Sequence, residues 1–455
     1  MKACHKLFFL TPVCALLAAG SVHATNGMLM EGYGPISTGM GGASQAIDHG
    51  NAGMAQNPAT LGMMADGTAR LDVAFGILGP DVSSAMAAMP TAESGGTSYL
   101  MPAFGYTRRN GALTYGLGVF AQGGMGTEYG ANSFLAAGSG SPVRSELGVG
   151  NVIFPVAYQV NPNLTVGAQL KFMWSSLDLR MAATPAQLGA MVTGGSGNLG
   201  AALLDPAGPL STATWARIDF SDDNDFTGAA KSTGFGAALG MTYKVNKDVV
   251  VGASYQFKSA LNDMETGGSS ASMTANPGAA PIATFDDAGK ITVIDFQMPS
   301  VFAVGASWQA SPALLLAADL KYIGWNDAMK SFKMRYDSTG VGGSVSFAMQ
   351  QEWKDQAVLN LGMAWKANEA LTLRAGLNLA GNPIPDNFVN PLFPATVKNH
   401  VTLGLGYQVS KAGDFNMSVT MAPKVTVATP ATPTMPSISI AHSQTNWQFM
   451  YSHRF

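Results

Sequence analysis

NLTVGAQLKFMWS, residues 163–175, is the segment that decides the fold, because its side chains alternate between two kinds of surface. Successive side chains of a β-strand point to opposite faces. One face would carry Leu164, Val166, Ala168, Leu170, Phe172 and Trp174, and the other Thr165, Gly167, Gln169, Lys171 and Ser175. An apolar face opposite a small, polar face is typical of a strand that separates lipid from an aqueous lumen.

The same alternation recurs along the chain and predicts fourteen strands. They are residues 67–79, 97–109, 111–122, 147–160, 163–180, 231–245, 247–260, 289–309, 313–327, 350–367, 369–380, 399–410, 413–423 and 445–455. A soluble β-sandwich also alternates. However, Trp174, Trp308 and Tyr322 stand near predicted strand ends, as the aromatic girdles of a membrane barrel require.

The composition supports a membrane protein that is built from strands. Charged residues make up 12% of the chain, about half of the usual share in soluble proteins. No stretch after residue 24 has the ~18 consecutive apolar residues of a spanning helix. An unpaired backbone amide is costly in the hydrocarbon core of a bilayer, so only helices and closed barrels cross it. We therefore expect an all-β fold, a 14-stranded antiparallel transmembrane β-barrel, in the outer membrane of a Gram-negative cell.

The chain begins with a predicted signal peptide, residues 1–24. Lys2 and Lys6 precede a short apolar core, and small residues end the segment at Ala24. Cys4 and Cys14 both lie in this leader, so disulfides, thiol catalysis and thiolate metal sites are excluded from the mature chain. Acidic residues outnumber basic ones, 28 to 25, with no basic block, which argues against a nucleic-acid partner.

Two further regions are distinguished by their pattern. Residues 25–66 are rich in Gly, Ala and Met and alternate poorly, which favours a hatch that plugs a barrel formed by residues 67–455. Connections between the predicted strands are alternately tight and long. Segments 123–146, 181–230, 261–288 and 326–349 are the long ones and are expected to face the outside. The acidic run 221–225 is interpreted as a solvated loop, with a calcium site as the lesser alternative.

Several short motifs, in this order, resemble those of the FadL family of outer-membrane transporters. They are Gly32-Tyr33-Gly34, Gly39-Met40-Gly41-Gly42-Ala43, Asn57-Pro58-Ala59, Arg374-Ala375-Gly376-Leu377-Asn378, Asn382-Pro383-Ile384-Pro385, Asn390-Pro391 and His400-Val401-Thr402-Leu403-Gly404. The resemblance implies a plugged 14-stranded barrel that takes up long-chain fatty acids or similar hydrophobic molecules. The same fold implies an alternative, a channel for aromatic or alkane hydrocarbons. An adhesin barrel and a hydrophilic porin are less favoured readings.

The resemblance also implies roles for particular residues. In such transporters the ligand is first caught in an extracellular apolar groove, for which the chain offers Phe134, Leu135, Leu188, Met191 and Leu203. Exposed apolar loops of this kind need an explanation such as ligand binding, although mutual packing explains them equally well.

Three basic residues are predicted to face the lumen. Lys171, Lys321 and Arg374 are candidates for binding a ligand headgroup, since a buried carboxylate needs a positive partner. The alternative is that they pair with lumen acids, which we favour for Lys321 because Asp319 is close in sequence.

Gating and release are assigned to two further motifs. Asn57, Pro58 and Ala59 are expected to form a rigid turn of the hatch near the binding pocket. Gly123 and Gly124 end the third predicted strand, where glycines favour a bulge and hence a lateral opening. An ordinary transition from strand to loop is an equally good explanation.

No catalytic residue, metal site or cofactor is predicted. None of the histidines outside the leader stands in a nucleophile or metal motif. The expected partners are a hydrophobic small molecule, outer-membrane lipid with lipopolysaccharide, and the barrel assembly machinery, which recognises aromatic terminal strands such as Trp447–Phe455. The protein is expected to be a monomer.

Overall fold

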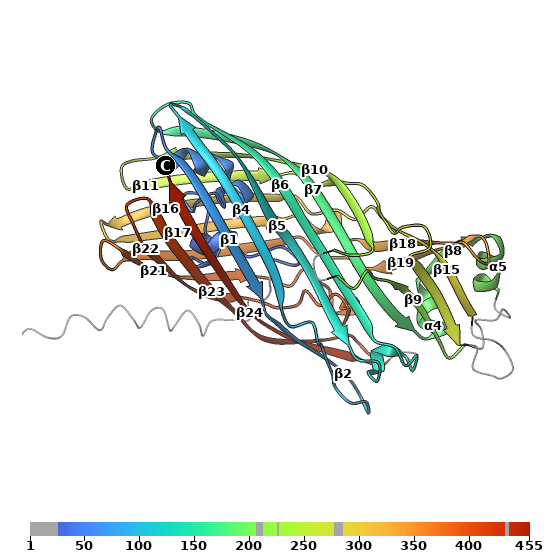
Figure 1. The fold of residues 1–455 in the computed structure, drawn as a ribbon. Coiled ribbons are helices and arrows are strands. Elements are labelled where there is room, and N and C mark those ends of the chain that lie inside the picture. Colours follow the sequence, from blue (N-terminus) through green and yellow to red (C-terminus); the bar gives the residue numbers. More distant parts are fainter. Residues whose placement is uncertain (1–25, 206–212, 225–226, 277–284, 433–435) are drawn as a thin grey trace, which may run out of the picture.

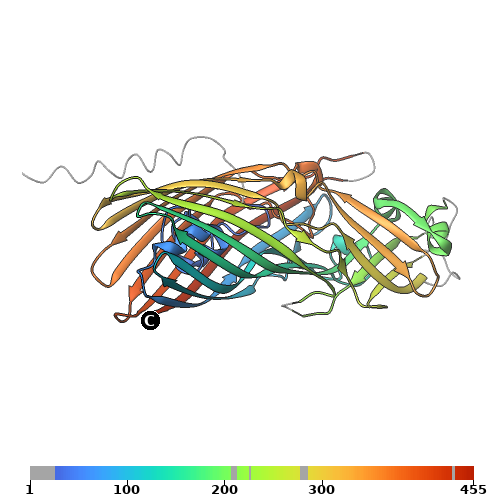
Figure 2. The ribbon, with the colours of Figure 1, turned by 90° about the horizontal axis from the view of Figure 1, so that it is seen from above.

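The strands of the chain form one continuous antiparallel sheet that curls into a long barrel (Figures 1 and 2). The computed structural model describes residues 26–205, 213–224, 227–276, 285–432 and 436–455. The predicted signal peptide, residues 1–24, lies outside the described residues. No helix in the described part of the chain is long and apolar enough to cross a membrane.

The sheet closes on itself because the last strand pairs with the first. β1 (Ala69–Leu78) pairs with β4 (Tyr99–Asn110) on one side and with β24 (Ile438–Arg454) on the other. The other members of the ring, in order, are β5 (Leu113–Tyr129), β6 (Val143–Gln159), β7 (Leu164–Ala183), β10 (Ala230–Lys244), β11 (Val249–Gln256), β16 (Val301–Ser311), β17 (Leu314–Ile323), β20 (Gln356–Lys366), β21 (Leu371–Ala380), β22 (His400–Gln408) and β23 (Gly413–Ala428). Each predicted strand overlaps one of these ring strands.

The described chain has 24 strands, so the predicted total of fourteen counts the ring alone and is too low for the whole sheet. Connections between the ring strands form further strands that extend the sheet at one end. The additional strands are β2 (Pro80–Met86), β3 (Ala92–Glu93), β8 (Val192–Ser196), β9 (Trp215–Phe220), β12 (Ala260–Leu261), β13 (Met264–Glu265), β14 (Ala271–Asn276), β15 (Phe285–Ile294), β18 (Ser331–Ser338) and β19 (Ser344–Gln350). Most of them were missed because strand pairing beyond the membrane does not require an apolar outer face. Most of β15 falls within the predicted strand 289–309, which the structure divides into β15 and β16.

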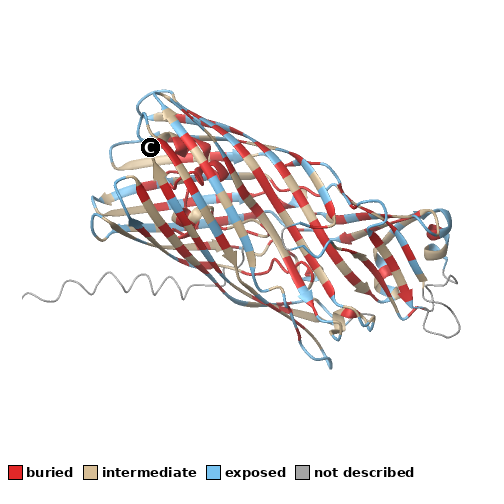
Figure 3. Cartoon of the chain, viewed as in Figure 1, coloured by how far each residue is buried: buried red, intermediate tan, exposed pale blue. Residues whose placement is uncertain are grey.

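Alternation along the ring strands is confirmed by burial (Figure 3). In β7 the side chain of Leu170 is 67% exposed on the outer face, whereas the neighbouring Lys171 is 4% exposed and faces inward. Trp308 and Tyr322 are also exposed on the outer face. The apolar side therefore faces out, which is the reverse of a soluble protein and is what a lipid environment demands.

Residues 26–68 lie inside the ring, near the end that carries the C-terminus (Figure 1). They form three short helices, α2 (Gly34–Thr38), α3 (Gly53–Gln56) and η1 (Pro58–Met63), which pack on strands from both sides of the barrel. The remaining helices belong to connections outside the ring and are η2 (Phe134–Ala136), α4 (Pro185–Met191), α5 (Gly197–Leu204), α6 (Trp325–Ala328) and η3 (Asp386–Phe388). We refer to residues 26–68 as the inner segment.

Glycines in the ring strands let the inner segment lie directly on the wall. A Cβ added at Gly252 of β11 would stand 1.8 Å from the carbonyl oxygen of Gln45, and one at Gly376 of β21 would stand 2.1 Å from the amide nitrogen of Gly41. No side chain fits in such a space, so these strands carry glycine where backbone meets backbone.

The first prediction concerns this contact. We expect Gly252→Ala to push Gln45 off the wall and to weaken docking of the inner segment by about 2 kcal/mol, the usual cost of overpacking. Hydrogen exchange of residues 40–60 should accelerate, while exchange of the ring strands stays slow.

A matched control is Gly148→Ala in β6, where the nearest atom to the added Cβ is 3.7 Å away. If both variants left exchange of residues 40–60 unchanged, the wall glycines would not govern docking.

Candidate functional site

A cavity of about 380 Å³ lies between the inner segment and the ring. The first described residues, Gly27 to Glu31, form one wall of this cavity. Parts of β4, β5, β6 and β24 form the opposite walls, and residues 394–397 also line it. Most lining side chains are apolar, including Met28, Val82 and Leu147. Its size falls within the usual range of small-molecule sites.

The cavity is lined by both faces of the ring wall. Leu147 and Val149 of β6 line it from the lumen side. Gly148 and Gly150 also line it, although their positions in the same strand belong to the outer face. Trp174, on the outward face of β7, also contributes, and its ring packs over Gly150. Such a lining places one end of the cavity at the outer surface of the barrel.

The wall is interrupted beside this end of the cavity. Pairing between β4 and β5 stops at Phe104 and Val119, so Tyr99 to Ala103 have no partner in β5. The register of β5 against β6 shifts between Ala121 and Gly123, which leaves Gln122 as the extra residue of a β-bulge. The bulge bends β5, and Pro102 in β4 has no amide hydrogen to donate to it.

The inner segment pairs with this bulge. Leu29 and Gly123 form an antiparallel bridge, and the Gly124 amide donates to the carbonyl oxygen of Met28 at 3.2 Å. The Tyr33 hydroxyl donates to the carbonyl oxygen of Gln122 at 2.7 Å. Gly123 and Gly124 therefore lie at the expected bulge, but β5 continues beyond them to Tyr129 and does not end there. Their role in lateral opening stays a prediction.

Two histidines and a glutamate were not singled out from the sequence, yet they line the cavity. Glu31, His400 and His442 are each at least nine-tenths buried. His442 Nδ1 lies 2.7 Å from the carbonyl oxygen of Pro394, and His400 Nδ1 lies 3.3 Å from Asn378 Oδ1. The Asn390-Pro391 and His400 motifs marked these neighbourhoods, but nothing in the sequence places Glu31 beside them.

None of the three predicted headgroup residues lines the cavity. Lys171 Nζ donates to Gln256 Oε1 at 2.7 Å, and Gln256 in turn donates to the carbonyl oxygen of Ala55. Lys321 Nζ donates to the carbonyl oxygens of Glu31 and Gly42. Arg374 Nη1 donates to Asn416 Oδ1 at 3.0 Å. All three face inward as expected. Lys321 donates to the inner segment directly, and Lys171 is joined to it through Gln256.

Asp319 does not form an ion pair with Lys321, which was the alternative for that lysine. Its Oδ2 accepts hydrogen bonds from the backbone amides of Ser44 at 2.6 Å and Gln45 at 3.1 Å. Asp319 and Lys321, at successive inward positions of β17, thus present an acceptor and a donor to the backbone of the inner segment. Both groups hold the inner segment in place.

Asn57, Pro58 and Ala59 are buried in the lumen and do not line the cavity themselves, and their expected place near the binding pocket stays a prediction. Asn57 Nδ2 donates to the carbonyl oxygens of Gln45 and Met241 at 2.9 and 3.1 Å. Its Oδ1 accepts from the amide of Ala59, which caps η1. Their gating role stays a prediction, and the observed contacts join the inner segment to β10.

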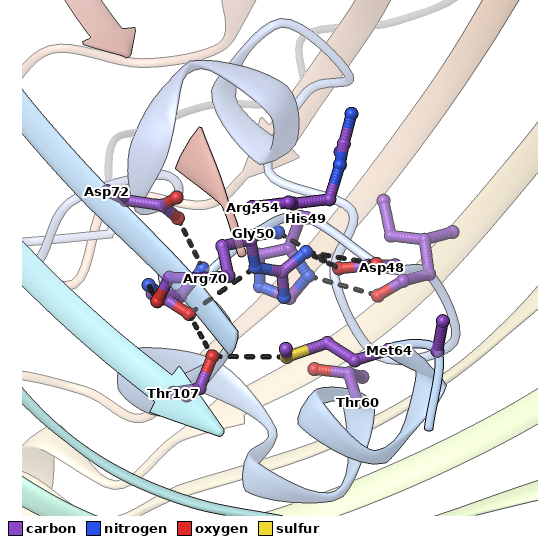
Figure 4. A network of polar contacts seen from close by, with 12 residues as sticks. Asp48, His49, Gly50, Thr60, Met64, Arg70, Asp72, Thr107 and Arg454 are labelled. Atoms are coloured by element: carbon purple, nitrogen blue, oxygen red, sulfur yellow. Dashed lines mark hydrogen bonds and ion pairs between the residues drawn. The ribbon is translucent and has the colours of Figure 1, made fainter. Parts of the chain in front are cut away.

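A network of charged and polar side chains anchors the inner segment near the C-terminal end of the barrel (Figure 4). Arg70 of β1 makes a bidentate ion pair with Asp48 at 2.9 and 3.1 Å. The Asn51 amide donates to Asp72 at 2.7 Å, and Thr107 donates to Asn51 Oδ1. His49 lies between these groups and is fully buried.

The predicted extracellular residues lie in the sheet extension beyond the ring. Leu188 of α4 is 5% exposed, and Phe134, Leu135, Met191 and Leu203 pack on the same apolar cluster. Leu188 is therefore buried and the other four are partly buried, so their packing role is observed, and ligand capture there stays a prediction. The acidic run 221–225 is described through Asn224, where Asp222 and Asp223 form ion pairs with Lys231, Arg144 and Arg180.

Comparison with known proteins gives one family and several similar structures. The family of outer membrane protein transport proteins (OMPP1/FadL/TodX) matches residues 16–452. The P. putida toluene transporter TodX is 31% identical with a TM-score of 0.82, over 93% of this chain and 99% of that chain. The Ralstonia pickettii toluene transporter TbuX is 29% identical with a TM-score of 0.75, over the same shares.

Two further matches give less information about this chain. A Pseudomonas aeruginosa FadL homologue is 15% identical with a TM-score of 0.70, over 94% of this chain and 99% of that chain, and shows the fold alone. An uncharacterized Chlorobium limicola protein, from the 5′ region of a phosphoenolpyruvate carboxykinase gene, is 50% identical over 70 residues. That match covers 15% of this chain and 34% of the Chlorobium protein.

The second prediction concerns His49. Burial lowers the pKa of His49 to about 4, from 6.5 for a free histidine. Between these values the released segment binds a proton that the docked segment does not, so acidification favours release. We expect docking to weaken as pH falls from about 6.5 to about 4, by up to about 3 kcal/mol. Amide protection factors of residues 44–60 measure this change.

His49→Gln should flatten this dependence, because glutamine does not titrate in that range. Equal pH dependence in the variant and in the original protein would assign the effect to another group.

Proposed function

Since the chain belongs to the OMPP1/FadL/TodX family of outer-membrane transport proteins, we propose that it takes up small uncharged hydrophobic molecules, monoaromatic hydrocarbons among them. The observation that carries this proposal is the cavity lining. It is largely apolar and, among the described residues, includes no lysine or arginine. The toluene transporters TodX and TbuX are similar to this chain over most of its length, which supports the same substrate class.

A neutral ligand suits the cavity better than a fatty acid does. A carboxylate that leaves water needs a cationic partner, because an unpaired buried charge is costly. The lumen cations Lys171 and Lys321 already donate to other groups, and neither reaches the cavity wall. Burial of apolar surface alone supplies about 25 cal/mol per Å², so a hydrocarbon is bound without such a partner.

The exit proposed for the ligand is sideways, through the interruption between β4 and β5. The cavity reaches the outward face of β6 there, beside the bulge at Gln122. A hydrocarbon would pass from an apolar cavity into the apolar core of the membrane, so the transfer needs no energy source. Residues 28–31 stand between the lumen and this exit, and their pairing with the bulge makes them the proposed gate.

Entry is proposed at the sheet extension. The apolar cluster around Leu188 and Phe134 lies on the side of the ring from which the long connections emerge. An apolar surface in water collects hydrophobic solutes. In this proposal the apolar cluster supplies the cavity with ligand. Contact with lipopolysaccharide, recognition by the barrel assembly machinery and a monomeric state remain expectations.

The third prediction tests the substrate class. We expect the purified protein to bind toluene more tightly than a long-chain fatty acid, as measured by titration calorimetry in detergent. Leu147→Trp should fill the cavity and weaken toluene binding at least about tenfold, since steric exclusion removes the apolar contacts.

The matched control is Lys171→Met, which removes a lumen cation that does not line the cavity. It should leave toluene affinity within about twofold. Tighter binding of the fatty acid, with loss of that binding in the Lys171→Met variant, would restore the fatty-acid function and overturn this one.

The fourth prediction tests the lateral exit. Deletion of Gln122 removes the extra residue of the bulge, so β5 can pair regularly with β6 and straighten toward β4. We expect uptake of labelled toluene by cells that carry the deletion to fall strongly, while binding by the purified protein persists.

Gln122→Ala is the control, because it keeps the residue count and hence the bulge, and loses only the contact of Gln122 Oε1 with Asn151. Undiminished uptake in the deletion variant would exclude the exit between β4 and β5.

A further inference from the structure

Two residues that line the apolar cavity each carry a buried polar atom that has no hydrogen-bond partner among the described residues. One is Oε1 of Glu31, in the inner segment, and the other is Nε2 of His442, in β24. The two residues are 5% and 6% exposed, and both line the cavity. Buried polar atoms without partners are uncommon and call for an explanation, because burial removes the hydrogen bonds that they would make with water.

Both atoms are hydrogen-bond acceptors. A carboxylate oxygen only accepts. His442 Nδ1 lies 2.7 Å from the carbonyl oxygen of Pro394, which also only accepts, so the ring proton of neutral His442 is on Nδ1. Its Nε2 then carries a free lone pair. Two side chains of the cavity lining therefore each carry an acceptor that no donor among the described residues satisfies.

The surroundings favour a neutral donor over a cation. Glu31 lies close enough to Lys321 and His400 to interact electrostatically with both, so its charge is already balanced in part within the barrel. The rest of the wall, including Met28, Val82 and Leu147, is apolar, and a charged ligand would lose its hydration there without full compensation.

We propose that the cavity preferentially binds hydrophobic molecules that carry one neutral hydroxyl group, of which phenols are the simplest class. The hydroxyl donates to Glu31 Oε1 or His442 Nε2, and the ring fills the apolar remainder of the cavity. The inference rests on the proposed function, since it refines the ligand of the same cavity. It adds a polar selectivity that an apolar tunnel for hydrocarbons does not need.

The test compares three ligands of similar shape with the purified full-length protein. These are 4-methylphenol, its methyl ether 4-methylanisole, and toluene. The ether keeps the ring and the oxygen but has no donor hydrogen. We expect the phenol to bind about tenfold more tightly than the ether, the usual range for one buried hydrogen bond to such an acceptor.

Variants identify the acceptors. Glu31→Leu and His442→Phe each remove one acceptor, and at least one of them should bring the ratio of phenol affinity to ether affinity close to one. Because the two ligands are compared within the same variant, a general change in the cavity wall affects both and leaves the ratio unchanged. The backbone carbonyl of Glu31, which accepts from Lys321, is kept in Glu31→Leu. The matched control Leu147→Ala changes the apolar wall and should affect all three ligands equally.

The outcomes are distinguishable. Equal affinity for the phenol and the ether, with toluene bound, would overturn this inference and leave the proposed function standing. A phenol preference that survives in both acceptor variants would also overturn it. If none of the three ligands bound, the inference and the proposed function would fail together.

Discussion

The pairing of backbone amides governs this structure. Within a bilayer an unpaired N–H or C=O group costs several kcal/mol, so the ladder of hydrogen bonds has to run around the barrel and return to its start. The pairing of β1 with β24 completes it. Closure then fixes an inside and an outside, and the alternation of side chains along each strand assigns every residue to one of them.

The proposed exit lies where the described strands depart from this rule. Pairing between β4 and β5 ends at Phe104 and Val119, and β5 bulges at Gln122. Some of the backbone groups released there are satisfied from within, because Met28 and Tyr33 bond to Gly124 and Gln122. The inner segment thus supplies hydrogen bonds that the interrupted strand pairing lacks, and it also covers the interruption. Displacement of residues 28–31 would expose the gap and open the cavity toward it in a single movement.

The lumen has a polar part, where the inner segment docks, and an apolar part, which is the cavity. Polar and charged side chains of the ring, such as Asp319, Lys321 and Arg70, bind the backbone and the acidic side chains of the inner segment. The cavity between that segment and β4 to β6 is apolar, with Glu31, His400 and His442 as its buried titratable groups. Of the lumen bases that by sequence could have served an anionic ligand, Lys321 binds the inner segment, whereas Lys171 and Arg374 donate to side chains of ring strands. This division is what moves the expected ligand from a fatty acid toward a neutral molecule.

The sequence alone determined the ring strands and the direction of their side chains, because alternation with a period of two is a local property of each strand. Lys171 and Lys321 face the lumen as that pattern predicts, and the FadL-like motifs indicated the family. The contacts of those side chains were decided only by tertiary structure. Strand register and docking of the inner segment bring Lys321 to the carbonyl oxygens of Glu31 and Gly42, far away in sequence. The cavity likewise joins Glu31 at the start of the chain to His442 near its end, a meeting that exists only once the barrel has closed.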